Sequence, residues 1–282
     1  MSDLQSPNSG QSNDRTGSLD PAQTASSAAA VGAVVLGLLA SGRALASVFM
    51  RTLFFVLRGT TQRGAVTAQM YEIGNRSLVF LCVVMGFIGM IFVYQTGVQT
   101  KRVVPDLSLL GATYLELLVR DLAATISALM LATRVGAGIA AEIGSMVVTE
   151  QVDALRMCAA DPIDYLLKPR FVASVIMTTM LVVLAAAVAT ATGTYTGWLY
   201  FEINPRTFVS GQLLDVGDVT VGLTKCVAYG AAIPVISGYC GLTAYGGSEG
   251  VGQATTRAVV NSSLAVIILD FLISGAGFLV FG

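Results

Sequence analysis

The sequence contains no histidine and few charged residues of either sign. Only 12% of its 282 residues are charged and 54% are hydrophobic, whereas soluble domains carry roughly a quarter charged residues. A water-soluble fold would therefore lack polar surface. Without histidine, the usual metal ligand and neutral-pH proton carrier are missing, which counts against a metal site and against most hydrolytic enzymes. The net charge of −1 gives no basis for nucleic-acid binding.

Cysteine is scarce as well. The four cysteines form no Cys-x-x-Cys pair, and three of them lie in apolar runs. Small hydrophobic packing is therefore the expected role, in preference to a disulfide or a metal site. We expect no catalytic residue, no bound metal and no cofactor in this chain.

Long apolar stretches predict an all-α integral membrane protein. About 20 apolar residues are needed to cross a bilayer as a helix. Four stretches meet this length with at most one charge, and a fifth carries Glu116, Arg120 and Asp121. The five predicted spans cover residues 77–100, 107–133, 171–201, 226–248 and 258–282.

The residues before the first span divide into two parts. Residues 1–27 are polar and lack large apolar side chains, so we predict a disordered cytoplasmic tail. Residues 28–63 are apolar but contain Arg43, Arg51 and Arg58, which fall within roughly 80° of one another on a helix. This pattern predicts a helix lying in the membrane surface. The alternative is a poor transmembrane span with charged ends.

Lysine and arginine placement predicts the orientation of the chain. These residues gather before the first span and between the second and third spans. Because cytoplasmic loops are enriched in positive charge, we expect both segments and the N-terminus in the cytoplasm, with the C-terminus outside.

The segment between the second and third spans, residues 134–170, contains two helix-start signals. Thr149 is expected to cap a helix of two to three turns beginning at Glu150, and Asp161 a second helix with Pro162 at its first position. If the segment were one continuous helix, Glu142, Glu150 and Asp153 would share a face of roughly 80°, although Gly144 argues against continuity. The acidic face suits a basic pocket on a soluble partner, or the segment is a solvated loop.

Two motifs in this order resemble those of a known family. They are TEQVDALRMCAADPIDYLLKPR at residues 149–170 and ATTRAVVNSSLAVIILDF at residues 254–271. Both are similar to the motifs of the MlaE/YrbE family, permeases that partner MCE proteins in lipid ABC transport. Weaker similarity covers QMYEIGNRSL and GFIGMIFVYQTG, so the resemblance runs from Gln69 to the C-terminus.

The resemblance implies a permease domain over residues 28–282 that pairs with a second copy of itself around a central lipid cavity. It implies a coupling helix near residues 150–157, containing Gln151, Ala154 and Leu155, that grips a cytoplasmic ABC ATPase, while an MCE-domain protein docks outside. The resemblance further implies that lipid, with phospholipid as the expected class, moves between a bacterial inner membrane and the MCE carrier or outer membrane. The chain has no GxxxxGK[ST] phosphate loop, so ATP and Mg²⁺ would be used by the ATPase partner.

Charges inside the predicted spans are the second group of candidate functional residues. An unpaired charge there costs at least about 2.5 kcal/mol. We hypothesise that Arg120 and Asp121, with Glu116 one turn before, line the lipid cavity, where Arg120 meets a phosphate and Asp121 balances its charge. A structural ion pair is the alternative, and the sequence VRDLAAT departs here from the family's Leu-Arg-Glu-Leu-Gly-Pro.

Further candidates remain open. Tyr94 and Gln95, near the outer end of the first span, are additional cavity residues. Lys225 and Asp270 either pair with each other or Lys225 extends to the membrane interface. Two other functions compete with the permease: an ion-coupled secondary transporter, in which the intramembrane carboxylates carry protons or ions, and a membrane scaffold that only anchors an external ring.

Overall fold

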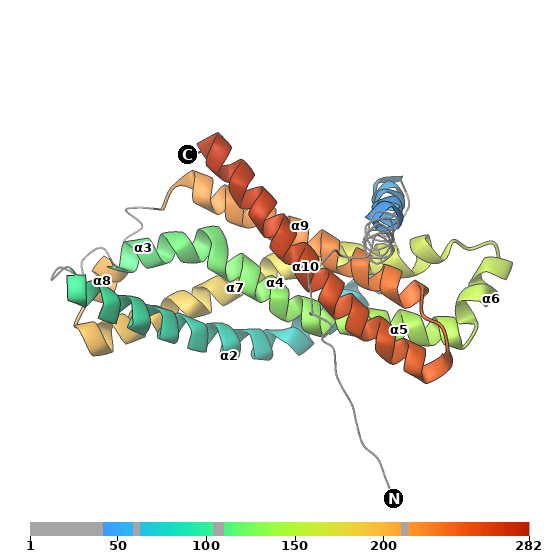
Figure 1. Cartoon of the computed structure of the whole chain (residues 1–282), viewed down its shortest axis with the longest axis horizontal. Helices are drawn as coiled ribbons and strands as arrows, with labels where there is room; N and C mark the ends of the chain where they lie inside the picture. The colour runs from blue at the N-terminus through green and yellow to red at the C-terminus, as the bar shows by residue number, and fades with distance from the viewer. Residues whose placement is uncertain (1–41, 59–62, 104–109, 210–213, 282) are drawn as a thin grey trace, which may run out of the picture. The chain divides into compact units, whose positions relative to one another are not determined.

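The computed structural model describes residues 42–58, 63–103, 110–209 and 214–281 (Figure 1). By its internal contacts the chain divides into Met1–Ala44 and Leu45–Gly282. In the first part only residues 42–44 are described, and they are helical; in the second part helix continues to residue 58. The predicted tail over residues 1–27 and the start of the predicted surface helix lie outside the described residues. That the helix lies in a membrane surface stays a prediction.

Five helical rods are long and apolar enough to cross a membrane, which confirms the predicted all-α membrane fold. The first is α2 (Arg63–Val103), the third is η3 (Ile163–Leu167) followed by α7 (Lys168–Phe201), the fourth is α9 (Val216–Leu242) and the fifth is α10 (Gly247–Phe281). Most rods extend beyond the apolar stretch that predicted them, but the predicted end of the fourth span at residue 248 is wrong: α9 stops at Leu242, and a turn with Gly246 and Gly247 at positive φ separates it from α10. All regular structure in the described part of the chain is helical.

The second rod is built from five segments that run into one another without a loop. They are α3 (Leu110–Leu117), the π-helical turn η1 (Leu118–Leu122), α4 (Ala123–Leu131), the π-helical turn η2 (Ala132–Gly136) and α5 (Ala137–Val148). π-helical turns are rare and are found frequently at functional sites. Both π turns here carry charge, since η1 contains Arg120 and Asp121 and η2 contains Arg134.

Within Leu45–Gly282, α2 packs along α7, and α10 packs against α9 and α5 (Figure 1). A glycine permits the closest approach of α2 to α7: a Cβ atom added at Gly89 would lie 2.5 Å from the carbonyl oxygen of Ala189. One turn earlier, a Cβ added at Gly86 would make only ordinary contacts, 3.5 Å or more from its neighbours. Small residues at such positions let helix backbones approach closely in lipid.

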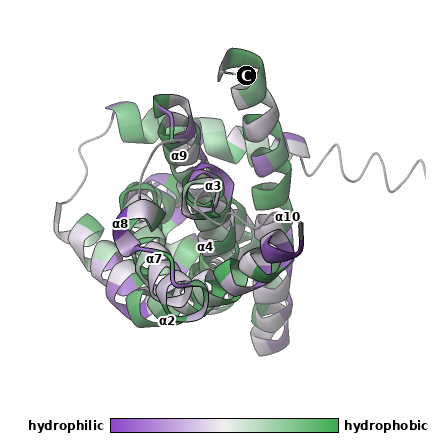
Figure 2. Cartoon of the chain, turned by 90° about the vertical axis from the view of Figure 1, so that its left-hand side faces the viewer, coloured by the Kyte–Doolittle hydropathy of each residue, from purple (hydrophilic) through white to green (hydrophobic). Residues whose placement is uncertain are grey.

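Hydrophobic side chains are exposed on the outside of the helices as well as buried between them. Figure 2 shows hydrophobic segments along the helical ribbons. The outward-facing group is widest on α10 and includes Leu264, Ile267, Phe271 and Leu279, all exposed. Large exposed apolar surface is unusual for a soluble protein. It is the surface expected of helices whose solvent is lipid.

The segment between the second and third rods contains α6 (Gln151–Met157), a two-turn helix as predicted. Its predicted cap is wrong, because the Thr149 hydroxyl donates to the Ser145 carbonyl at 2.8 Å and so closes α5. Glu150 follows in the left-handed conformation, with φ of 61°, and turns the chain. The break in the helix therefore lies at Thr149 and Glu150, not at Gly144, and a continuous acidic face from Glu142 to Asp153 does not form.

Both ends of the loop after α6 are fixed by hydrogen bonds. The Ala160 amide donates to the Leu155 carbonyl and the Ala159 amide to the Arg156 carbonyl, at 3.1 and 3.0 Å. This is the Schellman arrangement, which places Ala159 in the left-handed conformation with φ of 58°. The predicted cap at Asp161 is confirmed, since its carboxylate accepts the Ile163 amide at 2.9 Å.

Candidate functional site

A cluster of charges lies inside the helical bundle and centres on Lys225 of α9. The Lys225 side chain is 0% exposed. Its ammonium group contacts the Asp121 carboxylate of η1 and lies 2.7 Å from the Asp270 carboxylate of α10. Three rods are thereby joined by one cation. Of the alternatives that the sequence left open, pairing of Lys225 with Asp270 is confirmed and extension to the interface is wrong.

Neutral hydroxyl groups complete the surroundings of Asp270. The Tyr229 hydroxyl donates to its Oδ1 atom at 2.8 Å, and the Thr125 hydroxyl donates to the same atom at 3.0 Å. A buried carboxylate is tolerated when hydrogen bonds and an opposite charge replace its water. Asp270, on α10, is therefore held in place by partners from both α4 and α9.

Arg120 belongs to a second ion pair beside the first. Its Nη1 atom lies 3.2 Å from Oδ1 of Asp218, near the start of α9. Asp218 also accepts the Asp215 amide at 3.1 Å, as part of the cap that begins α9. The expectation that Asp121 balances Arg120 is thus wrong in its pairing: adjacent residues on a helix do not face each other, and each finds its partner on another helix.

These three ion pairs form what we call the ion-pair cluster: Arg120, Asp121, Asp218, Lys225 and Asp270. It holds two cations and three carboxylates, so one negative charge is in excess. Lys225 is enclosed, but 35% of the Arg120 side chain and 39% of the Asp121 side chain are exposed. The cluster therefore presents one guanidinium edge and one carboxylate edge at the surface of the bundle.

The cluster lies well inside the second and fourth membrane-spanning rods, away from their ends. Asp121 and Lys225 follow the starts of their rods, at Leu110 and Val216, by about ten residues, which at 1.5 Å per residue is roughly 15 Å. The rods are apolar on either side of it. This depth makes the exposed groups the main polar feature that a lipid or ion would meet there.

The remaining predicted cavity residues are not gathered around this cluster. Glu116 lies one turn before Arg120, is half-buried, and makes no ion pair within the described ranges. The Tyr94 ring packs edge-on against Tyr200 of α7, with centroids 5.2 Å apart. Gln95 lines a shallow groove of about 420 Å³ together with Phe92 and Gln99. Tyr94 and Gln95 thus face different neighbours, and no contact among the described residues joins either to Arg120.

The predicted coupling residues fall into two places. Glu150, Gln151, Asp153 and Ala154 are exposed on α6 or directly before it, and Leu155 is half-buried. This group, with the buried Val152 as its anchor, lies at one end of the bundle (Figure 1). Glu142 lies two turns earlier on α5, where its carboxylate is 2.7 Å from the guanidinium of Arg170 on α7.

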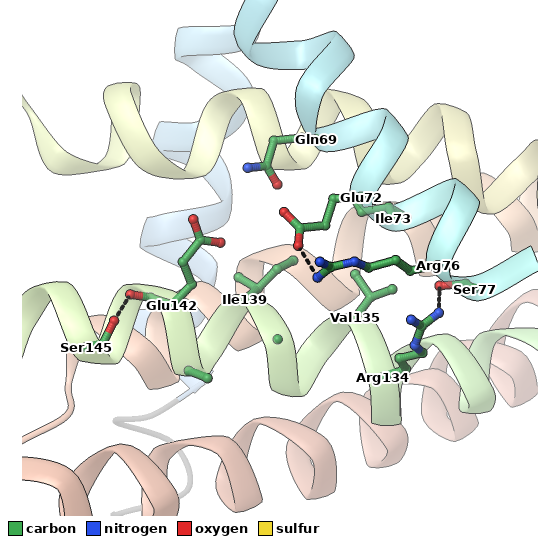
Figure 3. A pocket seen from close by; sticks show the side chains of 12 residues that line it. Gln69, Glu72, Ile73, Arg76, Ser77, Arg134, Val135, Ile139, Glu142 and Ser145 are labelled. Atoms are coloured by element: carbon green, nitrogen blue, oxygen red, sulfur yellow. Dashed lines mark hydrogen bonds and ion pairs between the residues drawn. The ribbon is translucent and has the colours of Figure 1, made fainter.

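A cleft of about 610 Å³ opens between the start of α2 and the second rod, and sequence reasoning missed it. Figure 3 shows Glu72 and Arg76 meeting above Val135 and Ile139, while Arg134 reaches Ser77 at one end. The signal in the sequence is that Arg76 and Arg134 each stand at the end of an apolar run, but the sequence does not show that these two ends lie side by side. Among the described residues, no group of histidine, cysteine or acidic side chains is arranged to hold a metal ion.

Comparison with known proteins gives consistent results. A family model described as Permease MlaE matches residues 66–276. A probable ABC transporter permease protein of Synechocystis is 38% identical over 221 residues, covering 78% of this chain and 84% of the relative. Another from Rickettsia typhi is 36% identical over 211 residues, covering 74% and 81%. The Arabidopsis thaliana chloroplastic protein TRIGALACTOSYLDIACYLGLYCEROL 1 is 33% identical over 221 residues, covering 78% of this chain and 63% of the relative.

Proposed function

Because this chain belongs to the MlaE permease family, we propose that it is the subunit through which an ABC transporter moves lipid. A permease of this kind is a non-catalytic membrane subunit, and a separate ATPase hydrolyses the ATP. The permease works in a dimeric arrangement.

The observation that carries the lipid assignment is the partly exposed Arg120 at membrane depth. Its Nη1 atom is paired with Asp218, and 35% of the arginine side chain is exposed at the surface of the bundle. A guanidinium presents a fork of donors that matches a phosphate. A phospholipid offers that phosphate together with acyl chains suited to the apolar helices around it.

One relative supports a lipid cargo in general, although the lipid in its name is a galactolipid that carries no phosphate. The Arabidopsis relative bears the name of a lipid, trigalactosyldiacylglycerol. We propose phospholipid as the cargo of this chain, and an MCE-domain protein on the outer side as the carrier that exchanges lipid with it. The membrane would be a bacterial inner membrane with the N-terminus in the cytoplasm, in keeping with the arginines that precede the first span.

We assign α6 to contact with the ATPase, which uses ATP and Mg²⁺. Its exposed acidic residues, Glu150 and Asp153, offer a negative surface to a basic pocket on that partner. A displacement of α6 would reach the second rod through α5 and the third through η3. The Glu142–Arg170 ion pair links α5 directly to α7, so the two rods would move together and change the opening of a cavity between the two permease copies.

The test is ATP-driven transfer of a fluorescent phospholipid from vesicles that contain the permease with its ATPase. We expect Arg120→Ala to slow transfer 10- to 100-fold, since a charge-assisted hydrogen bond is worth about 1.5–3 kcal/mol. Arg120→Lys should retain part of the rate, because it keeps the charge but loses the fork. Transfer by Arg120→Ala at the unchanged rate, with only its thermal midpoint lowered, would show the arginine to be structural.

One observation favours a second candidate, an ion-coupled secondary transporter. The ion-pair cluster holds one carboxylate more than its cations balance, and such a group inside a membrane can take a proton. The same vesicles separate the two functions. The ABC permease should transfer lipid with ATP after an ionophore has collapsed the proton gradient, whereas a secondary transporter should stop without the gradient and run without the ATPase.

A further inference from the structure

The cleft between α2 and the second rod has features of a binding site that the proposed function does not use. It lies toward the α6 end of the second rod, with Arg134 thirteen residues beyond Asp121, or roughly 20 Å along the helix. Its floor is apolar and is formed by Ile73, Val135 and Ile139. Its volume of about 610 Å³ falls within the usual range for small-molecule sites, roughly 300–1,000 Å³.

Both carboxylates that line the cleft, Glu72 and Glu142, are already paired with arginines other than Arg134. The Glu72 carboxylate is 2.7 Å from the guanidinium of Arg76, and the Glu142 carboxylate is 2.7 Å from that of Arg170, just outside the cleft. Arg134 donates one hydrogen bond to the Ser77 hydroxyl at 3.1 Å. Within the described parts of the chain no carboxylate pairs with Arg134. A monoanion is the ligand that would complete this arrangement.

The height of Arg134 in the membrane narrows the choice of anion. No charged residue occurs from Ser77 to Thr100 on α2 or from Leu122 to Thr133 on the second rod. Arg134 and Ser77 therefore meet where the apolar stretch of both rods ends. That is the level at which lipid headgroups lie, at the edge of a hydrocarbon layer of about 30 Å. A free anion in water would not need the apolar floor below this arginine.

We propose that the cleft binds the phosphate of a membrane phospholipid, with Arg134 as the residue that contacts it. Arg134 is held toward the cleft by Ser77, and the apolar floor receives the glycerol and the first carbons of the acyl chains. Arg76 and Glu72 lie above the floor and bound the headgroup (Figure 3). The site is separate from the ion-pair cluster. It goes beyond the proposed function, since it requires only that the chain spans a membrane.

A glycine in the wall allows the cleft to be filled without disturbing the fold. A Cβ atom added at Gly138 would meet no atom within 4 Å, so Gly138→Leu places a side chain in the cleft and also favours the helix. Gly252 on α10 is equally open and does not line the cleft. Gly252→Leu is therefore the matched control.

The experiment uses the full chain with its ATPase in nanodiscs that contain phosphatidylglycerol bearing a photoreactive diazirine near the glycerol. Labelled peptides are then identified by mass spectrometry. We expect labelling of residues 135–145 to fall about tenfold in both Arg134→Ala and Gly138→Leu, to recover partly in Arg134→Lys, and to stay unchanged in Gly252→Leu. Excess inorganic phosphate should not reduce it.

Three results would overturn the proposal. The first is labelling that is the same in all variants, and the second is full competition by inorganic phosphate, which would make the ligand a free anion. The third is no labelling of wild-type residues 135–145 together with a cross-link from Gly138→Cys to a second copy or to the ATPase, which would show a protein in the cleft. Lipid transfer by Arg120→Ala tests the proposed function, and labelling of residues 135–145 tests the cleft. Because the two are measured separately, one proposal can fail while the other stands.

Discussion

The ammonium nitrogen of Lys225 lies 2.7 Å from the carboxylate of Asp270, and the lysine side chain is fully buried between α9, α10 and η1. A lysine in this position is stabilised only by the carboxylates that surround it. The same contact fixes α10, the rod with the most exposed apolar surface, to the rest of the bundle. Stability and the electrostatics of the candidate site therefore depend on one residue.

Removing this cation should destabilise the protein strongly. Lys225→Met leaves Asp121 and Asp270 without their shared partner, and breaking a buried pair costs about 3–5 kcal/mol. We expect a large drop in the thermal midpoint of the detergent-solubilised protein. Lys225→Met combined with Asp270→Asn should regain part of the loss. An unchanged midpoint in the single variant would show that the carboxylates are solvated instead.

Close packing of α2 on α7 should make one glycine irreplaceable. Gly89→Ala puts a methyl group 2.5 Å from the Ala189 carbonyl oxygen, and such overpacking costs about 1–3 kcal/mol. Gly86→Ala, one turn earlier on the same helix, meets only side chains at ordinary distances and should be neutral or stabilising. Thermal melts of the two variants provide the comparison. Equal midpoints would mean that α2 and α7 separate at little cost.

The end of α6 carries an alanine where a glycine is preferred. Ala159 has φ of 58°, which L-residues adopt at a cost of roughly 1–2 kcal/mol. Ala159→Gly removes this strain but increases the freedom of the unfolded chain, so we expect a net gain of about 0.5–1 kcal/mol. The measurement is again the thermal midpoint, with Ala154→Gly inside α6 as the control that should lose stability.

Charge on α6 should decide whether the ATPase stays attached. Glu150→Lys with Asp153→Lys reverses two exposed carboxylates, and because the Asp153–Arg156 pair is solvated, its loss should hardly affect stability. We expect at least a tenfold drop in ATPase recovered with the affinity-purified permease. Glu249→Lys reverses an exposed charge at the start of α10 and should leave recovery unchanged. Equal recovery in both variants would remove α6 from the contact.

Sequence patterns predicted the rods well because a bilayer imposes one clear requirement, about 20 apolar residues per crossing. Sequence patterns were less able to predict which charged residues form ion pairs with each other. Lys225 and Asp270 are 45 residues apart, and only the packing of α10 on α9 brings them together. An ion pair between Arg120 and Asp121 was expected because the two residues are adjacent in sequence. On a helix, however, adjacent side chains point in different directions.

Local hydrogen bonding was predicted at one helix end and missed at another. Asp161 is followed by a proline and has one obvious use, the cap that it forms. Thr149 could close the helix before it or open the helix after it. The chain turns at Glu150, so Thr149 ends the helix before it. Glu150 has a left-handed backbone, a conformation that the propensity of glutamate does not favour. The cleft at Arg134 escaped notice because it forms between two rods, and one sequence does not show which rods are neighbours.

The π-helical turn η1 sets the angular register of everything before it in the second rod. A π turn contains one residue more than the α-helical turn that it replaces, and one residue corresponds to about 100° of rotation. Deleting a single residue there would restore an uninterrupted α-helix but swing α3 around its axis, or else carry Arg120 away from Asp218. The extra residue therefore couples the orientation of α3 to the pairing of Arg120 with Asp218. A one-residue insertion or deletion in η1 would disturb one or the other.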